Sequence, residues 1–422
     1  MPELVAPAGT PEKLITALHF GADAVYLGLK RFSLRSFAGN FDWDELEWAL
    51  AYARERGRRV YVAMNIQPFD PEMGDLEKAL VRLGQLGPDA VVVADPGVLA
   101  LGRRRVPGQR FHLSTQASVT NVEAANFWFD QEIRRIVLAR ELHLDHLAVL
   151  GPAARHRGGE LEVFVHGAVC VSWSGRCFSS LWWSHRDPRH GACAQACRWP
   201  FIAIEEARKP GRVHAVAGDE RGTYFFDARD LCALPVLDRL VATGVRALKI
   251  EGRTRSVAYV GLAVDAYRTA LDLLTRGDTD GFHASIPRLT DELFSVCKRG
   301  FSTHFLTGAE NHPDTSLPAG SPVGGEGNFF GKVVAVGSDH WDLEIRNPVR
   351  PGQTLELCDA GMRRVCHTLA TLHAADGTLL DMARPGDRIR VAGPALVQVE
   401  ALAREPLGQV PRSGVGTCTP AM

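Results

Sequence analysis

Short apolar strands alternate with helices through the first 280 residues, and this alternation limits the fold to a few α/β architectures. Eight apolar segments are predicted to be strands, and most of them precede a segment with helical periodicity. Eight strand–helix units suffice to close a parallel barrel. We therefore predict an α/β fold with a (β/α)8 TIM-like barrel over residues 1–280, and an open doubly wound sheet is the alternative. The predicted strands are residues 4–6, 24–29, 59–65, 90–94, 110–113, 135–138, 161–165 and 247–250.

The last quarter of the chain has a different pattern, rich in Gly, Val and Asp with frequent turn signals. Pro351-Gly352 and Pro385-Gly386 mark two of these turns. We predict a small C-terminal all-β domain over residues 321–404. Residues 281–320 are expected to form a helical connector, and residues 405–422 a disordered tail. The predicted strands of the β domain are residues 331–336, 341–345, 353–357, 363–369 and 388–392.

Polar side chains follow many of the predicted barrel strands. A barrel interior is expected to be filled with apolar side chains, with the active site at the carboxyl ends of the strands. Any single polar residue there could instead cap a helix, and Asp95 before Pro96 is the strongest candidate for a cap. Taken together they favour a shared site. The set comprises Tyr26, Asn65, Asp95, Gln116, Arg140, Glu141, His166, Glu251 and Arg253.

Four cysteines follow the seventh predicted strand, in the spacing C-x6-C-x15-C-x3-C. They are Cys170, Cys177, Cys193 and Cys197, and they lie in a predicted inserted segment, residues 166–232. Thiolates are soft ligands, and four gathered in one segment suit zinc or an iron–sulfur cluster. The alternative is a set of buried, inert thiols that pack as small hydrophobic groups.

Composition narrows the class of protein. Lys and Arg together number 48 against 49 Asp and Glu, so a nucleic-acid partner would need a local basic patch. The N-terminus lacks a signal-peptide pattern, and no apolar run reaches membrane-spanning length. We expect a cytoplasmic protein whose thiols stay reduced, which favours metal binding over disulfides. The sequence contains no P-loop, H-E-x-x-H or G-x-S-x-G motif.

Three motifs resemble the peptidase U32 family. They are L-V-A-P-A-G-T-P-E-K-L at the start, F-V-H-G-A-V-C-V-S-W-S-G-R-C-F-S-S in the middle and L-K-I-E-G-R-T-R-S at residues 248–256. The resemblance implies an oxygen-independent hydroxylase built around a [4Fe–4S] cluster. The form C-A-Q-A-C-R-W and the C-terminal β domain are most similar to the branch that hydroxylates the tRNA wobble uridine. That branch implies 5-hydroxyuridine as product, the anticodon region of tRNA as partner and prephenate as the hydroxyl source.

The resemblance also implies a ligand set for the cluster. Cys170, Cys177, Cys193 and Cys197 match the cysteines of the RNA-acting branches, and Cys232 is the alternative fourth ligand because the ubiquinone branch has a cysteine near that place. We expect Cys197 rather than Cys232 to complete the set.

The resemblance also suggests roles for other polar residues. His166 could be an acid/base or donate to a cluster sulfur, and Glu251 could be a base or pair with Arg253. Guanidinium groups bind carboxylates in a two-pronged fashion, so four arginines are expected to bind the dianionic co-substrate, and the alternative for any one of them is a surface salt bridge. The expected substrate-binding residues are Arg140, Arg176, Arg198 and Arg253, together with Asn65, Gln116 and Asn121, of which the last two could read a uracil edge or carry loop hydrogen bonds.

Four tryptophans of the cysteine segment could stack on RNA bases or pack in the core: Trp173, Trp182, Trp183 and Trp199. Three alternatives to the tRNA hydroxylase stay open from the sequence. They are a hydroxylase of ribosomal RNA or of a ubiquinone precursor, a collagenase-like peptidase, and a non-catalytic RNA-binding or redox-scaffold protein with a structural metal.

Overall fold

The computed structural model describes residues 1–170, 172–199, 229–297, 300–308, 329–393 and 397–407. Between residues 203 and 223 it describes the backbone of four short strands, β8 (Ala203–Glu205), β9 (Val213–Ala215), β10 (Gly218–Asp219) and β11 (Gly222–Thr223). The side chain of Arg198 and residues 408–422 of the predicted tail lie outside the described residues. The chain forms two compact units, one of Met1–Leu14, Asp23–Arg255 and Arg299–Leu317, the other of Ile15–Ala22, Ser256–Lys298 and Pro318–Met422.

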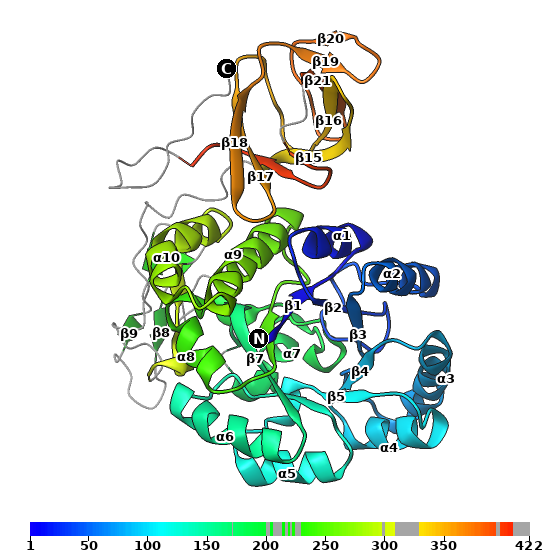
Figure 1. Cartoon of the computed structure of the whole chain (residues 1–422). Helices are drawn as coiled ribbons and strands as arrows, with labels where there is room; N and C mark the ends of the chain where they lie inside the picture. Colours follow the sequence, from blue (N-terminus) through cyan, green and yellow to red (C-terminus); the bar gives the residue numbers. More distant parts are fainter. Residues whose placement is uncertain are drawn as a thin grey trace. The chain divides into compact units, whose positions relative to one another are not determined.

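Eight parallel strands close into a barrel in the first unit (Figure 1). Each strand pairs with the next along the chain, and the last pairs with both the seventh and the first. The predicted TIM-like barrel is therefore confirmed, and the open sheet is wrong. The strands are β1 (Glu3–Pro7), β2 (Ala24–Gly28), β3 (Arg59–Ala63), β4 (Ala90–Val93), β5 (Phe111–Leu113), β6 (Arg135–Val137), β7 (Glu160–Ala168) and β13 (Ala247–Ile250).

Helices follow the strands and form the outer layer of the barrel in Figure 1. Local capping explains where several of them begin. Asp42 and Glu45 form a reciprocal capping box at the first turn of α2, and Asp95 accepts a hydrogen bond from Val98 N at the start of α4. The capping role expected of Asp95 is thus confirmed. The helices of this layer include α2 (Trp43–Glu55), α3 (Asp70–Leu86), α4 (Pro96–Arg105), α5 (Val122–Asp130), α6 (Leu144–His156) and α8 (Leu237–Ala242), and α1 (Pro11–His19) follows β1.

The barrel interior is not wholly apolar, contrary to the expectation from the sequence. Arg135 donates to Glu3 (2.5 Å), and Lys249 donates to Glu162 (2.6 Å), which also lies 3.4 Å from Arg135. All four side chains are at least 90% buried. Small residues of the same strands, such as Ala24, leave volume for these long side chains. Each buried charge has an opposite partner, which is the condition for burying ions at tolerable cost.

A short strand extends the barrel sheet beside the cysteine segment. Strand β12 (Asp230–Cys232) pairs antiparallel with β7 and parallel with β14 (Phe301–Ser302). Residues 231 and 232 therefore belong to a strand that the sequence analysis did not predict. The pairing places Cys232 opposite His166.

The second unit contains two helices and an antiparallel sheet. Helices α9 (Val257–Thr275) and α10 (Thr279–Phe294) precede eight strands in the order β18-β17-β22-β15-β16-β21-β19-β20. Buried Arg364 bridges Asp265 of α9 and Glu292 of α10, both at 3.0 Å. The predicted C-terminal all-β fold is confirmed. Its strands are β15 (Phe329–Val336), β16 (His340–Ile345), β17 (Thr354–Asp359), β18 (Arg363–Thr368), β19 (Leu372–Ala374), β20 (Leu379–Leu380), β21 (Arg388–Ala392) and β22 (Leu402–Arg404).

Candidate functional site

Glu251 lies directly after β13 and joins two arginines at the carboxyl end of the barrel. Its carboxylate is 3.5 Å from Arg35 Nε and 3.3 Å from Arg140 Nη2, and it is 91% buried. Burial alone would raise the pKa of Glu251, but Arg35, Arg140 and Arg253 outweigh burial and lower the pKa to about 2. A carboxylate with so low a pKa is a weak base. The structure therefore favours ion pairing, with Arg35 and Arg140 as the partners rather than the predicted Arg253.

Arg253 supports the loop that carries Arg35. Its guanidinium donates to Ser33 Oγ (2.9 Å), to the carbonyl oxygen of Leu34 and, at 3.5 Å, to Asn40 Oδ1. It is 98% buried, and these hydrogen bonds hold residues 33–40 in place. The geometry makes Arg253 a positioning residue.

Glycines make room for this loop. A Cβ on Gly28 would lie 2.1 Å from both Arg253 Nη1 and Ser33 Oγ, and one on Gly191 would lie 2.4 Å from Arg35 N. Gly191 also accepts a backbone hydrogen bond from Ser36. Gly191 therefore allows the cysteine segment to pack backbone against backbone on the loop, and Gly28 leaves room for the side chains of Arg253 and Ser33.

A second polar group lies after β3 and β5. Asn65 Nδ2 donates to Gln116 Oε1 at 3.0 Å, and Asn65 Oδ1 accepts from Leu34 N at 3.3 Å. Arg176 of the cysteine segment donates to the carbonyl oxygen of Gln116 at 2.7 and 3.1 Å. The structure thus brings together three of the predicted site residues: Asn65, Gln116 and Arg176.

The side chains of Asn121 and Arg140 both make hydrogen bonds within the protein. Asn121 caps α5 by accepting from Ala124 N at 2.8 Å, which is the loop-hydrogen-bond alternative. Arg140 donates to the carbonyl oxygen of Ala168 at 2.6 Å, and its guanidinium lies over the ring of Phe164. The Arg140 contacts join the loop after β6 to β7.

None of the four predicted cluster ligands is in a disulfide, and all four are half-buried. Ser180 organises the segment between them, because its hydroxyl accepts from Ala194 N and donates to the carbonyl oxygen of Arg186. Burial raises the pKa of Cys177, but hydrogen bonds from Ser172 and Ser179 outweigh this and lower it. Cys193 and Cys170 both contribute to the raised pKa of Arg35, after the larger effect of Glu251.

The thiols have the chemistry of cluster ligands, but the described residues do not form a closed metal site. No three His, Cys, Asp or Glu side chains among them are grouped so that they could hold a metal ion. The assignment of Cys170, Cys177, Cys193 and Cys197 to a cluster therefore stays a prediction. Cys232, the alternative ligand, is fully buried in β12.

His166 lies inside β7, buried against the ring of Phe301. Burial, helped by Arg255, lowers its pKa to about 4, so its imidazole is neutral at pH 7. The backbone carbonyl oxygen of His166 accepts from Glu251 N at 2.8 Å. The predicted catalytic pair is thus joined through the backbone at one end of β7.

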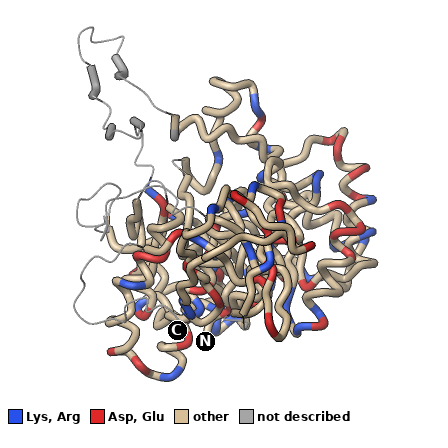
Figure 2. The backbone as a smooth tube through the Cα atoms, turned by 90° about the horizontal axis from the view of Figure 1, so that it is seen from above, with Lys and Arg blue, Asp and Glu red and all other residues tan. Residues whose placement is uncertain are grey.

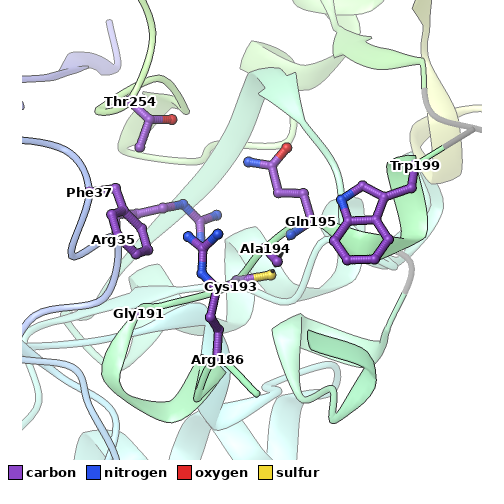
Figure 3. A pocket seen from close by; sticks show the side chains of 9 residues that line it. All are labelled: Arg35, Phe37, Arg186, Gly191, Cys193, Ala194, Gln195, Trp199 and Thr254. Carbon is purple, nitrogen blue, oxygen red and sulfur yellow. Dashed lines mark hydrogen bonds between the residues drawn. The ribbon is translucent and has the colours of Figure 1, made fainter. Parts of the chain in front are cut away.

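A cavity of about 440 Å³ opens between the loop and the cysteine segment. Figure 3 shows the guanidinium groups of Arg35 and Arg186 next to each other, with the sulfur of Cys193 alongside. The Arg186 guanidinium lies 4.2 Å from the Phe37 ring, and its Nε is buried without a hydrogen-bond partner among the described residues. Neither arginine was predicted as a site residue. Arg35 lies more than 150 residues before Cys193 in the sequence, and Arg186 lies in the insert.

Exposed aromatic side chains are numerous in the loop and the cysteine segment, and two of them, Phe37 and Trp199, line the cavity. Core packing is wrong for the four tryptophans, whose exposed fractions range from 37% to 79%. Phe37 and Phe178 are also more than 60% exposed. Exposed aromatic residues in such number mark an interaction surface.

The described helices include none that is both long and apolar enough to span a membrane. Figure 2 shows basic and acidic residues interspersed along the described backbone. A nucleic-acid partner would therefore meet local groups of arginine rather than a uniformly basic face.

Comparisons with known proteins agree with the motifs. A protein of Escherichia coli (strain K12) named tRNA hydroxylation protein P is 32% identical over 427 residues, covering 92% of each chain. Another from that strain, named 23S rRNA 5-hydroxycytidine C2501 synthase, is 32% identical over 84% of this chain and 52% of its own length. A Porphyromonas gingivalis protein named Collagenase is 29% identical over 72% of this chain and 73% of its own length.

The family model described as Peptidase family U32 matches residues 9–316, which include seven of the eight barrel strands and all four clustered cysteines. The chain therefore belongs to peptidase family U32, as its motifs predicted.

Proposed function

We propose that this protein is an RNA-modifying enzyme that hydroxylates the wobble uridine of tRNA. In this proposal a [4Fe–4S] cluster is the cofactor and prephenate supplies the hydroxyl group. The names of the relatives that span most of the chain support RNA hydroxylation. The cavity beside Cys193 is the observation that carries the proposal.

Two guanidinium groups in one cavity suit a dicarboxylate. Arg35 turns its Nε toward Glu251, and its terminal nitrogens make no hydrogen bond to the described residues. Arg186 likewise has a buried N–H group without a partner. The buried N–H of Arg186 is of a kind that is normally satisfied, and the Arg35 side chain is 32% exposed, so an anionic ligand could bind both groups. We therefore propose Arg35 and Arg186 as the carboxylate-binding pair, with Phe37 and Trp199 against the ring of prephenate.

The size of the cavity is also suitable. Its volume of about 440 Å³ lies within the range of small-molecule sites. Arg140, Arg176 and Arg253, which were predicted to bind the substrate, would position the site instead of contacting prephenate. Each of them is hydrogen-bonded to a backbone carbonyl oxygen near the site.

The exposed tryptophans support RNA as the substrate. Trp182 and Trp173 of the cysteine segment have exposed fractions of 79% and 58%, and Trp199 of the same segment lines the cavity that contains the two arginines. Unstacked bases of a single-stranded loop bind such aromatic faces. The anticodon loop presents its wobble base in this way.

The four half-buried thiols are the proposed cluster ligands because their donor chemistry fits iron. When bound, the cluster would supply redox and Lewis-acid chemistry beside the cavity. The residues of the chain bind and orient the two substrates, and Glu251 keeps Arg35 and Arg140 in place.

Nucleoside analysis tests the proposed substrate. Mass spectrometry of tRNA and ribosomal RNA from a deletion strain should show loss of 5-hydroxyuridine-derived nucleosides from tRNA only. Wild-type protein should restore them, and the Arg186→Ala variant should not. Loss from ribosomal RNA alone would favour the rRNA alternative, and unchanged RNA would exclude both.

Iron and sulfide analysis after anaerobic purification tests the proposed cofactor. We expect four irons per chain for the [4Fe–4S] cluster, and Ser substitution at Cys170, Cys177, Cys193 or Cys197 should lower the content, whereas Cys358→Ala should not. Iron loss in Cys232→Ser but not Cys197→Ser would transfer the fourth ligand to β12.

Gelatin hydrolysis tests the peptidase alternative, which the relative named Collagenase favours. The hydroxylase proposal predicts no hydrolysis by purified protein. Turnover that survives Cys193→Ser would contradict it, because that variant lacks a proposed cluster ligand.

A further inference from the structure

A second cavity opens at the opposite, amino-terminal end of the barrel strands. It has a volume of about 420 Å³ and is separate from the cavity beside Cys193. Side chains at the first positions of the strands form its rim, and side chains further along β3 and β5 form its floor. The lining residues are Arg59, Tyr61, Asp89, Arg110, His112, Arg134, Arg135 and Glu160.

The charges around this cavity leave a positive excess. Four arginines line it against two carboxylates, and the groups directly behind the floor are Lys249, Glu3 and Glu162. These nine side chains comprise five cations and four anions. Arg135 is fully engaged by carboxylates, whereas the side chain of Arg110 makes no hydrogen bond or ion pair with the described residues. The excess charge is therefore that of Arg110, at the rim.

The floor offers a polar group that the protein itself leaves unused. His112 is 95% buried, and its ring contacts Tyr61 with centroids 4.9 Å apart. Among the described residues its ring nitrogens have no hydrogen-bond partner. Burial, and then Arg135, lowers the pKa of His112 to about 3, so the ring is neutral and keeps one donor and one acceptor. These nitrogens are not among the buried atoms that lack a partner, so they are accessible from the cavity and can bind a ligand there.

The remaining rim arginines can turn toward a ligand at small cost. Arg59 lies 3.3 Å from Glu3, and Arg134 lies 3.6 Å from Glu160 and also donates to the carbonyl oxygen of Gly158. Both are more than half exposed, so these ion pairs contribute little stability. An anion between Arg59, Arg110 and Arg134 would gain charge-assisted hydrogen bonds from several sides.

We propose that this amino-terminal cavity is a binding site for a small oxyanion, a phosphate or a carboxylate, held by Arg110 at the rim and His112 at the floor. The site is distinct from the proposed cluster and prephenate site, and it does not depend on the proposed function. The alternative is that these polar side chains only stabilise the amino-terminal end of the barrel, as residues of this face do in most barrels.

Isothermal titration with inorganic phosphate and with succinate, each at an ionic strength matched by chloride, tests the site. The full-length protein should bind at least one of the two. Arg110→Ala should weaken that affinity at least tenfold, because it removes a charged donor. Arg104→Ala, an exposed arginine outside the cavity, is the matched control and should bind as the wild type does.

A His112→Gln variant gives a second reading that the rim charge does not affect. It should also lose affinity while melting within a few degrees of the wild type. Binding of phosphate alone would identify a tetrahedral oxyanion site, and binding of succinate alone a carboxylate site. No binding of either, or equal losses in the Arg104 and Arg110 variants, would overturn the proposal.

Discussion

At the scale of single residues, Glu251 has the largest electrostatic effect in the candidate site. It is the counter-ion of two arginines that come from loops far apart in the sequence, Arg35 and Arg140. Removing one partner of a buried ion group usually costs more than the group contributes, because the remaining charges stay buried. Glu251 therefore matters for stability as well as for the position of Arg35.

We predict that Glu251→Gln lowers the free energy of unfolding at pH 7 by about 3 kcal/mol, since the pKa of Glu251 falls from 4.5 to about 2 on folding. A lowered pKa means that this stabilisation is present above pH 4.5 and is lost as the pH falls toward 2. Urea unfolding of wild type and variant should therefore converge at low pH. Glu47→Gln, an exposed site, is the control, and a constant difference between the Glu251 variant and wild type down to pH 2.5 would contradict the assignment.

At the scale of elements, the loop of residues 29–41 shapes the cavity more than any helix does. It contains three non-glycine residues with left-handed backbone conformation: Phe32, Arg35 and Asn40. Such conformations cost energy and persist only where surrounding contacts enforce them. Here Arg253 and the close approach to Gly191 provide those contacts.

We predict that Gly28→Ala displaces this loop, because the new methyl group would overlap Arg253 Nη1 and Ser33 Oγ. The variant should lose about 1–3 kcal/mol of stability and most RNA hydroxylation. Gly74→Ala is the matched control, since nothing lies within 4 Å of its Cβ position in helix α3. It should be neutral or slightly stabilising in thermal unfolding. A Gly28 variant as stable and active as the Gly74 variant would show that the loop tolerates movement.

The elements themselves were largely predictable, whereas the site was only partly so. All eight barrel strands follow from apolar segments bounded by turns, because local patterning determines where strands lie. Strand β12 was missed because it is three residues long and merges with the helix after it. Arg35 and Arg186 were missed because no local pattern links a loop after β2 to an insert after β7. The interior ions such as Arg135 were missed because their partners are distant in sequence.

At the scale of the whole molecule, charge is balanced and mixed along the described chain (Figure 2). Affinity for RNA should therefore depend more on stacking than on a broad electrostatic field. A protein that makes roughly three phosphate contacts to a single strand loses only about twentyfold in affinity between 50 and 200 mM salt, and we expect a loss of this order here. Proteins with broad basic faces lose far more over that range.

We predict that Trp182→Ala weakens binding of an anticodon stem-loop by about fivefold to a hundredfold, since each stacked base contributes about 1–3 kcal/mol. Trp182 is the most exposed of the four tryptophans, so its loss should leave thermal stability unchanged. Trp48→Ala on helix α2 is the control for an exposed tryptophan outside the segment. Fluorescence anisotropy at two salt concentrations measures both effects, and equal affinities of the two variants would argue against stacking.

The support of Arg253 under residues 33–40 has a consequence for selectivity. Because residues 33–40 are held in place, the cavity cannot change its shape to accommodate a different small molecule. A molecule that does not fit the cavity should therefore not bind. An analogue of the proposed acid with one carboxylate replaced by an amide would leave one guanidinium without its anionic partner, and should be excluded by orders of magnitude rather than by a small factor.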